Sequence, residues 1–440
     1  MQSDTTDFSL GELVTLIRGN TYKSALLGQP GPVLLGLASI QRDGGFRGDS
    51  LKTYGGESAE KLLLRPGELY VSLKDVTQSG DLLGSVARLP KSVPLGRLTQ
   101  DTVKLQFDPE RYPADLLYWT LRCPEYRSYC RERAIGTTNL SLSRDDFLAF
   151  QLPLATAERL ELVALLEEIE HRINLLRQTS STLESIAQTF FKSWFIDFDP
   201  VRAKNEGREP EGMDPATAAL FPTEFEESTL GLIPKGWRVA TVADAVVFNP
   251  LRSLPKRDEA PYLEMANAPT AGHRPLARVG LRAFGSGCKF RNGDALLAKI
   301  TPCLENGKSA FVDFLDKDEI GWGSTEFIVM RAKPVLPEYC AYLLARHEAF
   351  RQFAIQAMTG TSGRQRVELS RLTQFPLALP PDESIASSVA PTFGALQSRI
   401  AANDEQAKAL AELRDALLPR LISGKLRLPD AQEQVEEALT

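Results

Sequence analysis

The chain repeats itself at a spacing of about half its length, and this duplication restricts its fold more than any other feature. Each copy contains a turn with a glycine and an acid before an apolar strand, then a second strand that leads through a proline-bearing loop into a helix. Three pairs of segments correspond: residues 65–73 with 291–299, 102–121 with 326–345, and 134–154 with 357–380. A long helical segment follows each copy, so the sequence predicts two similar globular units of mixed α/β structure, each followed by a helix.

Both helical segments carry apolar residues at heptad spacing, which is typical of a coiled coil. The first segment has two such rows, Leu162, Ile169, Leu176, Leu183 and Phe190, and Leu166, Ile173, Ser180, Ala187 and Trp194. The second segment repeats them 227 residues later as Val389, Leu396, Asn403, Leu410 and Leu417, and Phe393, Ile400, Ala407, Arg414 and Leu421. Two such helices of one chain, each about 50 Å long at 1.5 Å per residue, are expected to pair antiparallel.

Two polar residues, Asn403 and Arg414, interrupt the second seam. A polar residue buried in a coiled-coil seam often fixes the register of the helices at a cost in stability. The other interpretation is an exposed fault in a loosely packed helix, and the sequence leaves both open.

The first helical segment ends in the aromatic stretch "FFKSWFIDFDP". Phe190 and Trp194 fall on the heptad rows, whereas Phe191, Phe195 and Phe198 form a neighbouring stripe that one partner helix cannot also cover. That stripe either packs on a globular unit of the same chain or contacts another subunit.

Composition and targeting signals predict a globular cytoplasmic protein. The chain is 43% apolar and 25% charged, and it has no apolar run long enough for a bilayer. "MQSDTTDFSL" lacks the basic and apolar regions of a secretory signal, and the five cysteines form no CxxC pair, which predicts free thiols. His171, His273 and His347 have no metal-ligand spacing.

The net charge of −6 argues against a generally basic nucleic-acid binder, but the charge is unevenly distributed. Residues 153–231 carry 7 Lys or Arg against 15 Asp or Glu, whereas residues 232–376 carry 20 against 14. The acidic excess therefore lies mainly in the helical and linker segments, and the second globular unit has the sign of charge that attracts phosphates.

Three segments in a fixed order connect the chain to a known family. They are "QTFFKSWFIDFDPVRAK" at 188–204, "LFPTEFEESTLGLIPKGW" at 220–237 and "LLPRLISGKLRL" at 417–428. Together they closely resemble the specificity subunit of type I restriction–modification enzymes. The resemblance covers essentially the whole chain, because the order of the repeats is also that of the family.

The resemblance implies a function in DNA recognition. In that family each globular unit is a target recognition domain that reads one half of a bipartite DNA site, and the paired helices fix the gap between the halves. The implied partners are double-stranded DNA, two methyltransferase (modification) subunits held by the helices, and restriction (endonuclease and translocase) subunits, with no membrane. No cofactor is expected on this chain; S-adenosylmethionine, ATP and Mg²⁺ are expected on the partner subunits.

The implied fold class is α+β, with two target recognition domains separated by two long helices that pair as an antiparallel coiled coil. The expected boundaries are 1–152 for the first domain, 153–204 for the central conserved spacer helix, 205–231 for a linker, 232–380 for the second domain, 381–428 for the C-terminal conserved spacer helix and 429–440 for a tail. The residues expected at the spacer and partner interface are Leu162, Leu166, Ile169, Ile173, Leu176, Leu183, Phe190, Phe191, Trp194, Phe195, Phe198, Leu396, Ile400, Leu410, Leu417 and Leu421.

DNA readout requires Arg or Lys for guanine, Asn or Gln for adenine, and cations for phosphates. The loop candidates in the first domain are Arg42, Arg47, Lys52, Lys74, Thr138 and Asn139. Those in the second domain are Lys299, Thr301, Lys308, Arg364, Gln365 and Arg366. The loops differ between the two domains, so the sequence predicts two unlike half-sites.

No catalytic motif accompanies these candidates, so the chain is expected not to be an enzyme. It has no phosphate-binding G-x-x-x-x-G-K-[ST] loop, and "GSGCKF" lacks the third glycine of a dinucleotide fingerprint. Asp197 and Asp199 are interpreted as charges at a helix exit and not as a metal site. Two other functions remain to be distinguished, a fusion that carries its own methyltransferase activity and an adaptor that binds proteins on a coiled-coil rod.

Overall fold

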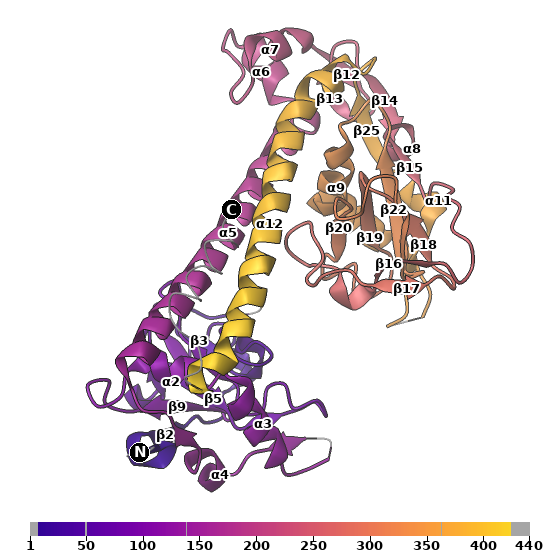
Figure 1. Cartoon of the computed structure of the whole chain (residues 1–440). Coiled ribbons are helices and arrows are strands. Elements are labelled where there is room, and N and C mark those ends of the chain that lie inside the picture. Colours follow the sequence, from indigo (N-terminus) through magenta and orange to yellow (C-terminus); the bar gives the residue numbers. More distant parts are fainter. Residues whose placement is uncertain (1–7, 49–50, 138, 362, 424–440) are drawn as a thin grey trace. The chain divides into compact units, whose positions relative to one another are not determined.

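The computed structural model describes residues 8–48, 51–137, 139–361 and 363–423 and separates into two compact units (Figure 1). Unit 1 comprises residues 1–173 and 408–440, and unit 2 comprises residues 174–407. Both mix helices with short sheets. No helix in the described part of the chain combines the length and apolar character needed to cross a bilayer.

Unit 1 is built on a four-stranded antiparallel sheet and a smaller three-stranded one. Its strands are β1 (Phe8–Ser9), β2 (Thr15–Arg18), β3 (Val33–Leu35), β4 (Leu63–Leu64), β5 (Leu69–Ser72), β6 (Lys74–Asp75), β7 (Val86–Arg88), β8 (Gly96–Leu98), β9 (Thr102–Gln106), β10 (Leu140–Ser141) and β11 (Gln151–Leu152). Its globular helices are α1 (Leu10–Leu13), α2 (Ala114–Thr120), α3 (Pro124–Glu132) and α4 (Arg144–Leu148). The strand orders are β2-β9-β5-β7 and β3-β8-β4, and β3 runs parallel to β8.

Unit 2 contains the corresponding sheets, with a fourth strand in the smaller one and an additional two-stranded pair. Its strands are β12 (Phe225–Ser228), β13 (Gly231–Pro234), β14 (Arg238–Thr241), β15 (Val246–Phe248), β16 (Glu259–Leu263), β17 (Leu281–Ala283), β18 (Cys288–Phe290), β19 (Asp294–Ala298), β20 (Ser309–Phe311), β21 (Gly321–Gly323), β22 (Phe327–Ala332), β23 (Met358–Thr359), β24 (Arg366–Val367) and β25 (Pro376–Leu379). Its shorter helices are α6 (Asp199–Asn205), α7 (Pro215–Leu220), α8 (Val242–Ala245), α9 (Glu338–Arg346), α10 (Glu348–Gln356) and α11 (Leu369–Leu372). The strand orders are β15-β22-β19-β20 and β17-β16-β21-β18, and β16 runs parallel to β21.

The duplication predicted from the sequence is confirmed by this topology. β5 lies inside the segment 65–73 and β19 inside 291–299, and each is a central strand of its four-stranded sheet. The short helices α1 and α8 both begin at a capping box, Ser9 with Glu12 in unit 1 and Thr241 with Asp244 in unit 2. The two globular parts are therefore copies of one design.

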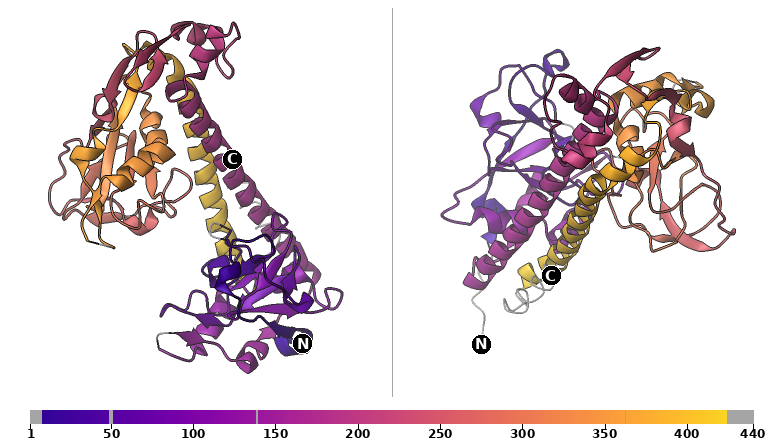
Figure 2. Two further views of the ribbon diagram at one scale, coloured as in Figure 1. Left: turned by 180° about the vertical axis from the view of Figure 1, so that it is seen from behind. Right: turned by 90° about the horizontal axis from the view of Figure 1, so that it is seen from above.

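Two long helices, α5 (Ala157–Phe195) and α12 (Ser384–Ser423), contribute to both units. In unit 1 the Arg414 guanidinium lies 2.6 Å from the Glu170 carboxylate. In unit 2 the ring of Trp194 meets that of Phe393 edge to face at 5.6 Å. In each unit the two helix segments run side by side and antiparallel (Figure 2).

Most predicted seam residues are buried within their own unit. Those buried in unit 1 are Leu162, Leu166, Ile169, Ile173, Leu410 and Leu417, and those buried in unit 2 are Leu176, Phe191, Trp194, Phe195 and Ile400. Those half-buried in unit 2 are Leu183, Phe190, Phe198 and Leu396. The side chain of Leu421 lies outside the described part of the structure.

The two interruptions of the seam are polar contacts and not exposed faults. Asn403 is 2% exposed, and its amide donates a hydrogen bond of 3.3 Å to the Ser180 hydroxyl in unit 2. Arg414 in unit 1 is paired with Glu170 and with Asp415. Because both polar groups have partners on or beside the opposite helix, they favour one register over others.

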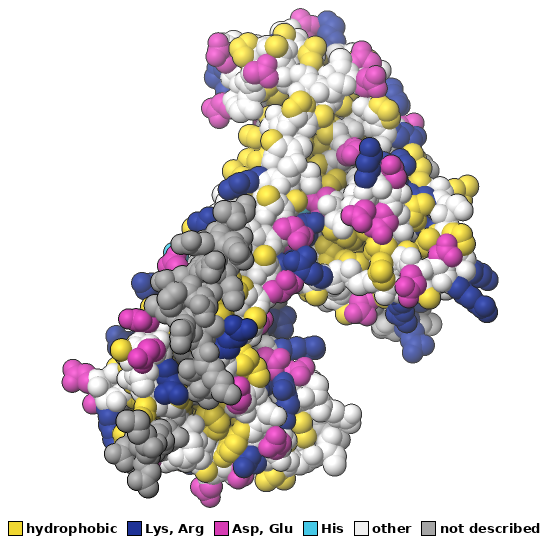
Figure 3. All heavy atoms as spheres, viewed as in Figure 1, with side chains coloured by type: hydrophobic (Ala, Val, Ile, Leu, Met, Phe, Trp, Pro, Cys, Tyr) yellow, Lys and Arg dark blue, Asp and Glu magenta, His cyan; other side chains and the backbone are white. Residues whose placement is uncertain are grey.

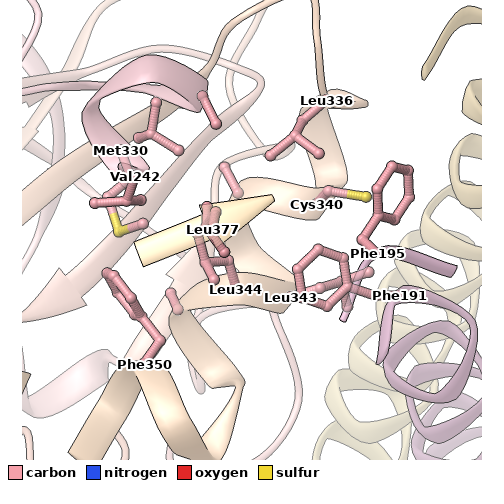
Figure 4. Packing of buried hydrophobic residues seen from close by; sticks show 14 of the residues in the cluster. Phe191, Phe195, Val242, Met330, Leu336, Cys340, Leu343, Leu344, Phe350 and Leu377 are labelled. Carbon is pink, nitrogen blue, oxygen red and sulfur yellow. The ribbon is translucent and has the colours of Figure 1, made fainter. Parts of the chain in front are cut away.

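The aromatic stripe packs on the globular part of its own chain. Phe191 and Phe195 are 2% and 4% exposed, and they lie beside Leu343 and Cys340 of α9 in the core of unit 2 (Figure 4). Phe198 is half-buried, and its ring meets that of Trp237 edge to face at 5.5 Å. Of the two alternatives for the stripe, the structure has the intramolecular one.

Two other segments differ from the expected boundaries. The expected spacer helix over 153–204 is interrupted, because Phe198 adopts a left-handed conformation with φ of 57° between α5 and α6. The expected linker over 205–231 contains α7 and β12, so part of it is regular structure.

Candidate nucleic-acid interface

Five of the predicted DNA-binding residues converge in unit 2 where β19 ends. β23 and β24 form a short hairpin. β24 also lies antiparallel to the residues that come directly after β19, with Arg366 opposite Ile300. The Val367 amide donates to the Lys299 carbonyl at 2.9 Å, and the Thr301 amide donates to the Gln365 carbonyl at 3.1 Å. This cluster, the unit 2 edge, consists of Lys299, Thr301, Arg364, Gln365 and Arg366.

The two arginines of the unit 2 edge differ in whether a carboxylate pairs with them. Arg366 donates to both carboxylate oxygens of Glu326, with its Nη2 at 2.8 Å, and this hydrogen bonding lowers the pKa of Glu326 below its usual range. The Arg364 side chain is exposed, and no hydrogen bond or ion pair joins it to another described side chain. Arg364 is therefore an exposed cation of this edge that is available to a ligand.

Lys308, the sixth candidate of the second domain, has a different position. It is half-buried, and its ammonium donates to the backbone carbonyls of Met265 and Ala266 at 2.6 Å and 3.2 Å. Its charge is used to hold the segment around Met265, so the structure does not bring it into the unit 2 edge.

Unit 1 has the equivalent edge with other side chains. β6 and β10 pair antiparallel, with Lys74 opposite Ser141, so Lys74 lies close to the loop that carries the exposed Asn139. The Lys74 ammonium lies 3.2 Å from the Asp101 carboxylate and is about half exposed. The unit 1 edge is thus defined by Lys74 and Asn139, and Thr138 lies outside the described residues.

The remaining candidates of the first domain come from the separate segment 42–52. Arg42 is 80% exposed at its side chain and lies 3.8 Å from Asp81, a residue of the loop after β6. Arg47 and Lys52 are exposed, and the Lys52 carbonyl accepts a hydrogen bond from the Leu34 amide of β3. The contact with Asp81 links Arg42 to the loop beside the unit 1 edge.

Sequence reasoning missed the acidic partners of both edges. Asp101 precedes β9 and faces Lys74, and Glu326 precedes β22 and pairs with Arg366 beside Lys299. The signal was present in the repeat, because each copy has a lysine within two residues after its central strand and an acid directly before the strand that pairs with it, β9 in unit 1 and β22 in unit 2. These carboxylates limit the positive charge of each edge.

The surface charge is mixed beyond the edges as well. On the face drawn in Figure 3, dark blue Lys and Arg side chains alternate with magenta Asp and Glu side chains over each unit. Neither unit presents an uninterrupted basic surface on that side.

Comparisons with known proteins find related sequences and a similar fold. The specificity subunit of the type I restriction enzyme EcoEI from Escherichia coli is 27% identical over 212 residues, which are 46% of this chain and 35% of that subunit. The chain therefore aligns with about a third of the length of that relative. The specificity subunit of the type I restriction enzyme MjaIX from Methanocaldococcus jannaschii is 24% identical over 332 residues, which are 72% of this chain and 70% of that subunit. No protein-family model matches the chain.

A solved structure shows the same fold. The S subunit of a type I restriction–modification system from M. genitalium superposes with a TM-score of 0.50 at 13% sequence identity, over 96% of this chain and 98% of that one. The similarities in sequence confirm the resemblance carried by the three sequence segments: the chain is a relative of the specificity subunits of type I restriction enzymes.

Proposed function

We propose that the chain is the DNA-reading subunit of a type I restriction–modification complex and has no catalytic activity of its own. The observation that carries this proposal is the duplicated edge. In both units a short strand pairs with the residues after the central strand, but the side chains there are Lys74 and Asn139 in unit 1 and Arg364 and Gln365 in unit 2. Such side chains can hydrogen-bond base edges and phosphates. Each unit would read one half of a bipartite site, and the halves would differ in sequence.

The paired segments of α5 and α12 are proposed to set the gap between the half-sites and to hold two methyltransferase subunits. Two specific polar contacts support a fixed register, Asn403 with Ser180 and Arg414 with Glu170. The methyltransferase and restriction subunits would supply S-adenosylmethionine, ATP and Mg²⁺ for the chemistry. The mixed surface charge implies weak DNA binding by this chain alone, since phosphate contacts dominate affinity.

The experiment that tests this proposal is co-expression with a methyltransferase subunit, followed by mapping of methylated adenines across a genome by single-molecule sequencing. The expected result is one bipartite motif with two unlike halves and a constant gap. Identical halves would contradict the assignment of unlike readers. A stable complex that methylates no motif would favour the adaptor function instead.

Replacing Arg364 with alanine is expected to weaken target methylation without unfolding unit 2, because its side chain is exposed and paired with no described side chain. Loss of one arginine that contacts a base costs about 1–3 kcal/mol of binding and relaxes one position of the motif, whereas loss of a phosphate contact lowers affinity on all sequences alike. Methylation mapping of the variant separates these two outcomes.

The matched control for Arg364 is Arg371→Ala, which removes the same charge from an exposed position on α11 outside the hairpin. Methylation by this control should match that of the parent chain. An equal loss in both variants would indicate a general charge effect and would remove Arg364 from the proposed interface.

A further inference from the structure

Unit 1 contains a cavity of about 380 Å³ with an unusual concentration of positive charge. The segment 41–44, the helix α3 and the C-terminal part of α12 surround it. Its arginines are Arg42, Arg122, Arg127, Arg131 and Arg414. Two aspartates also line it, Asp43 and Asp415, so cations outnumber anions in the lining.

Most of these arginines are held by the protein itself. Arg127 donates to the carbonyls of Leu83 and Asp81 at 2.5 Å and 2.7 Å, and Arg131 lies 2.5 Å from Asp43. Arg414 pairs with Asp415, as well as with Glu170 of α5. These contacts keep the guanidinium groups fixed around the cavity.

Arg122 differs from the others at one atom. It is 8% exposed, and no described residue accepts a hydrogen bond from its Nε. Its Nη1 donates to the Tyr118 hydroxyl at 3.1 Å and lies 3.8 Å from the Glu170 carboxylate, and its guanidinium lies over the Trp119 ring, 4.7 Å from the centroid. A buried N–H without an acceptor is costly, and an anion in the adjoining cavity that accepted from this Nε would remove that cost.

The second copy of the repeat carries different side chains or partners at two of these positions. Arg346 occupies the position of Arg122 in the second copy, and its Nη1 donates to the carbonyls of Thr270 and Gly307 at 2.7 Å and 2.9 Å. Its Nε lies 3.7 Å from Glu184. The position of Arg131 is taken by Ile355 in unit 2. The position of Arg127 keeps an arginine, Arg351, which pairs with Glu348 at 2.6 Å and whose Nε, like that of Arg122, has no acceptor among the described residues. Unit 2 therefore differs from unit 1 at the positions of Arg122 and Arg131, where it carries a hydrogen-bonded arginine and an isoleucine.

We infer that the cavity is a binding site for a phosphate group, either one of the DNA backbone or one of a free phosphate. Planar guanidinium donors match phosphate oxygens in geometry and charge, and Arg42, which is 80% exposed at its side chain, gives the site an accessible cation. A DNA source would rest on the proposed function, whereas a free phosphate would not.

The test is thermal unfolding of the full chain titrated with inorganic phosphate over the millimolar range, with ionic strength held constant by sodium chloride. Phosphate at concentrations well above its dissociation constant is expected to raise the Tm of unit 1 by roughly 2–4 °C. The double variant Arg42→Gln/Arg131→Gln should lose most of this rise. Both side chains are exposed, so the variant is expected to fold.

The control is Arg133→Gln, which removes the same charge just after α3 from a side chain that does not line the cavity. It should keep the full rise. The inference is wrong if phosphate does not raise the Tm of the parent chain, or if the double variant responds as the parent chain does.

A second measurement identifies the source of the phosphate. DNA affinity of the complex with a methyltransferase subunit is measured against salt concentration for the parent and the double variant. A uniform loss of affinity in the variant, with a smaller salt slope, assigns the site to the DNA backbone. Unchanged DNA binding together with the thermal response assigns it to a free phosphate, an outcome that does not depend on the proposed function.

Discussion

Replacing Phe191 and Phe195 together with alanine is expected to unfold most of unit 2. Both rings are almost fully buried beside α9, so their loss leaves cavities in the core. Each Phe→Ala change in a core costs about 3–5 kcal/mol, and a domain has about 5–15 kcal/mol of stability in total. Urea unfolding followed by tryptophan fluorescence reports the change, because Trp194, Trp237 and Trp322 lie in unit 2 and the Trp237 ring centroid lies 6.5 Å from that of Phe195.

The control for this prediction is Ile186→Ala on the same helix. Ile186 is 37% exposed, so its truncation should shift the urea midpoint by much less than either phenylalanine. A double variant that kept the parent midpoint and instead lost only the methyltransferase subunit would show that the stripe serves a partner and not the core.

This prediction also shows where sequence reasoning stops. The heptad rows identified Phe190 and Trp194 as seam residues, and they identified Phe191 and Phe195 as a second stripe. The surface opposite that stripe belongs to α9, which begins more than a hundred residues later, and no local pattern specifies that contact. Propensity and periodicity define a helix and its faces, whereas the partner of each face is decided by tertiary packing.

The candidate edges illustrate the same limit. The repeat predicted that residues 134–154 and 357–380 would have equivalent roles, and the structure places a hairpin or strand pair from each beside the end of the central strand. The sequence could not show that Arg366 is paired with Glu326 while the Arg364 side chain is exposed and paired with no described side chain. That difference depends on side-chain distances across the edge, and these were not encoded in the spacing of the motif. The arginine cavity was missed for the same reason, since segment 41–44, α3 and α12 are far apart in the chain.

The repeated turn with a glycine and an acid yields the last prediction, because its two copies have unequal burial. In unit 2 the Asp294 carboxylate is completely buried, 2.6 Å from Arg252 and 2.7 Å from Arg331, and it accepts a hydrogen bond from the Arg291 amide. Removing one partner of a buried ion pair leaves the other charges without compensation and costs about 3–5 kcal/mol. Asp294→Ala is therefore expected to lower the free energy of unfolding of unit 2 by that amount.

The natural control is the same residue of the other copy. Glu68 also accepts a hydrogen bond from the backbone of its turn, at the Arg65 amide, and pairs with Lys104 at 2.6 Å, but its side chain is 36% exposed. Water can replace the lost contacts, so Glu68→Ala should cost only about 1 kcal/mol. Hydrogen exchange read separately on β19 and β5 measures both costs in the full chain. If hydrogen exchange increased equally at β19 and at β5, the difference in burial between Asp294 and Glu68 would not determine how much each acid contributes to stability. The expected inequality would show that the two copies, although built on one design, have come to depend on different residues for stability.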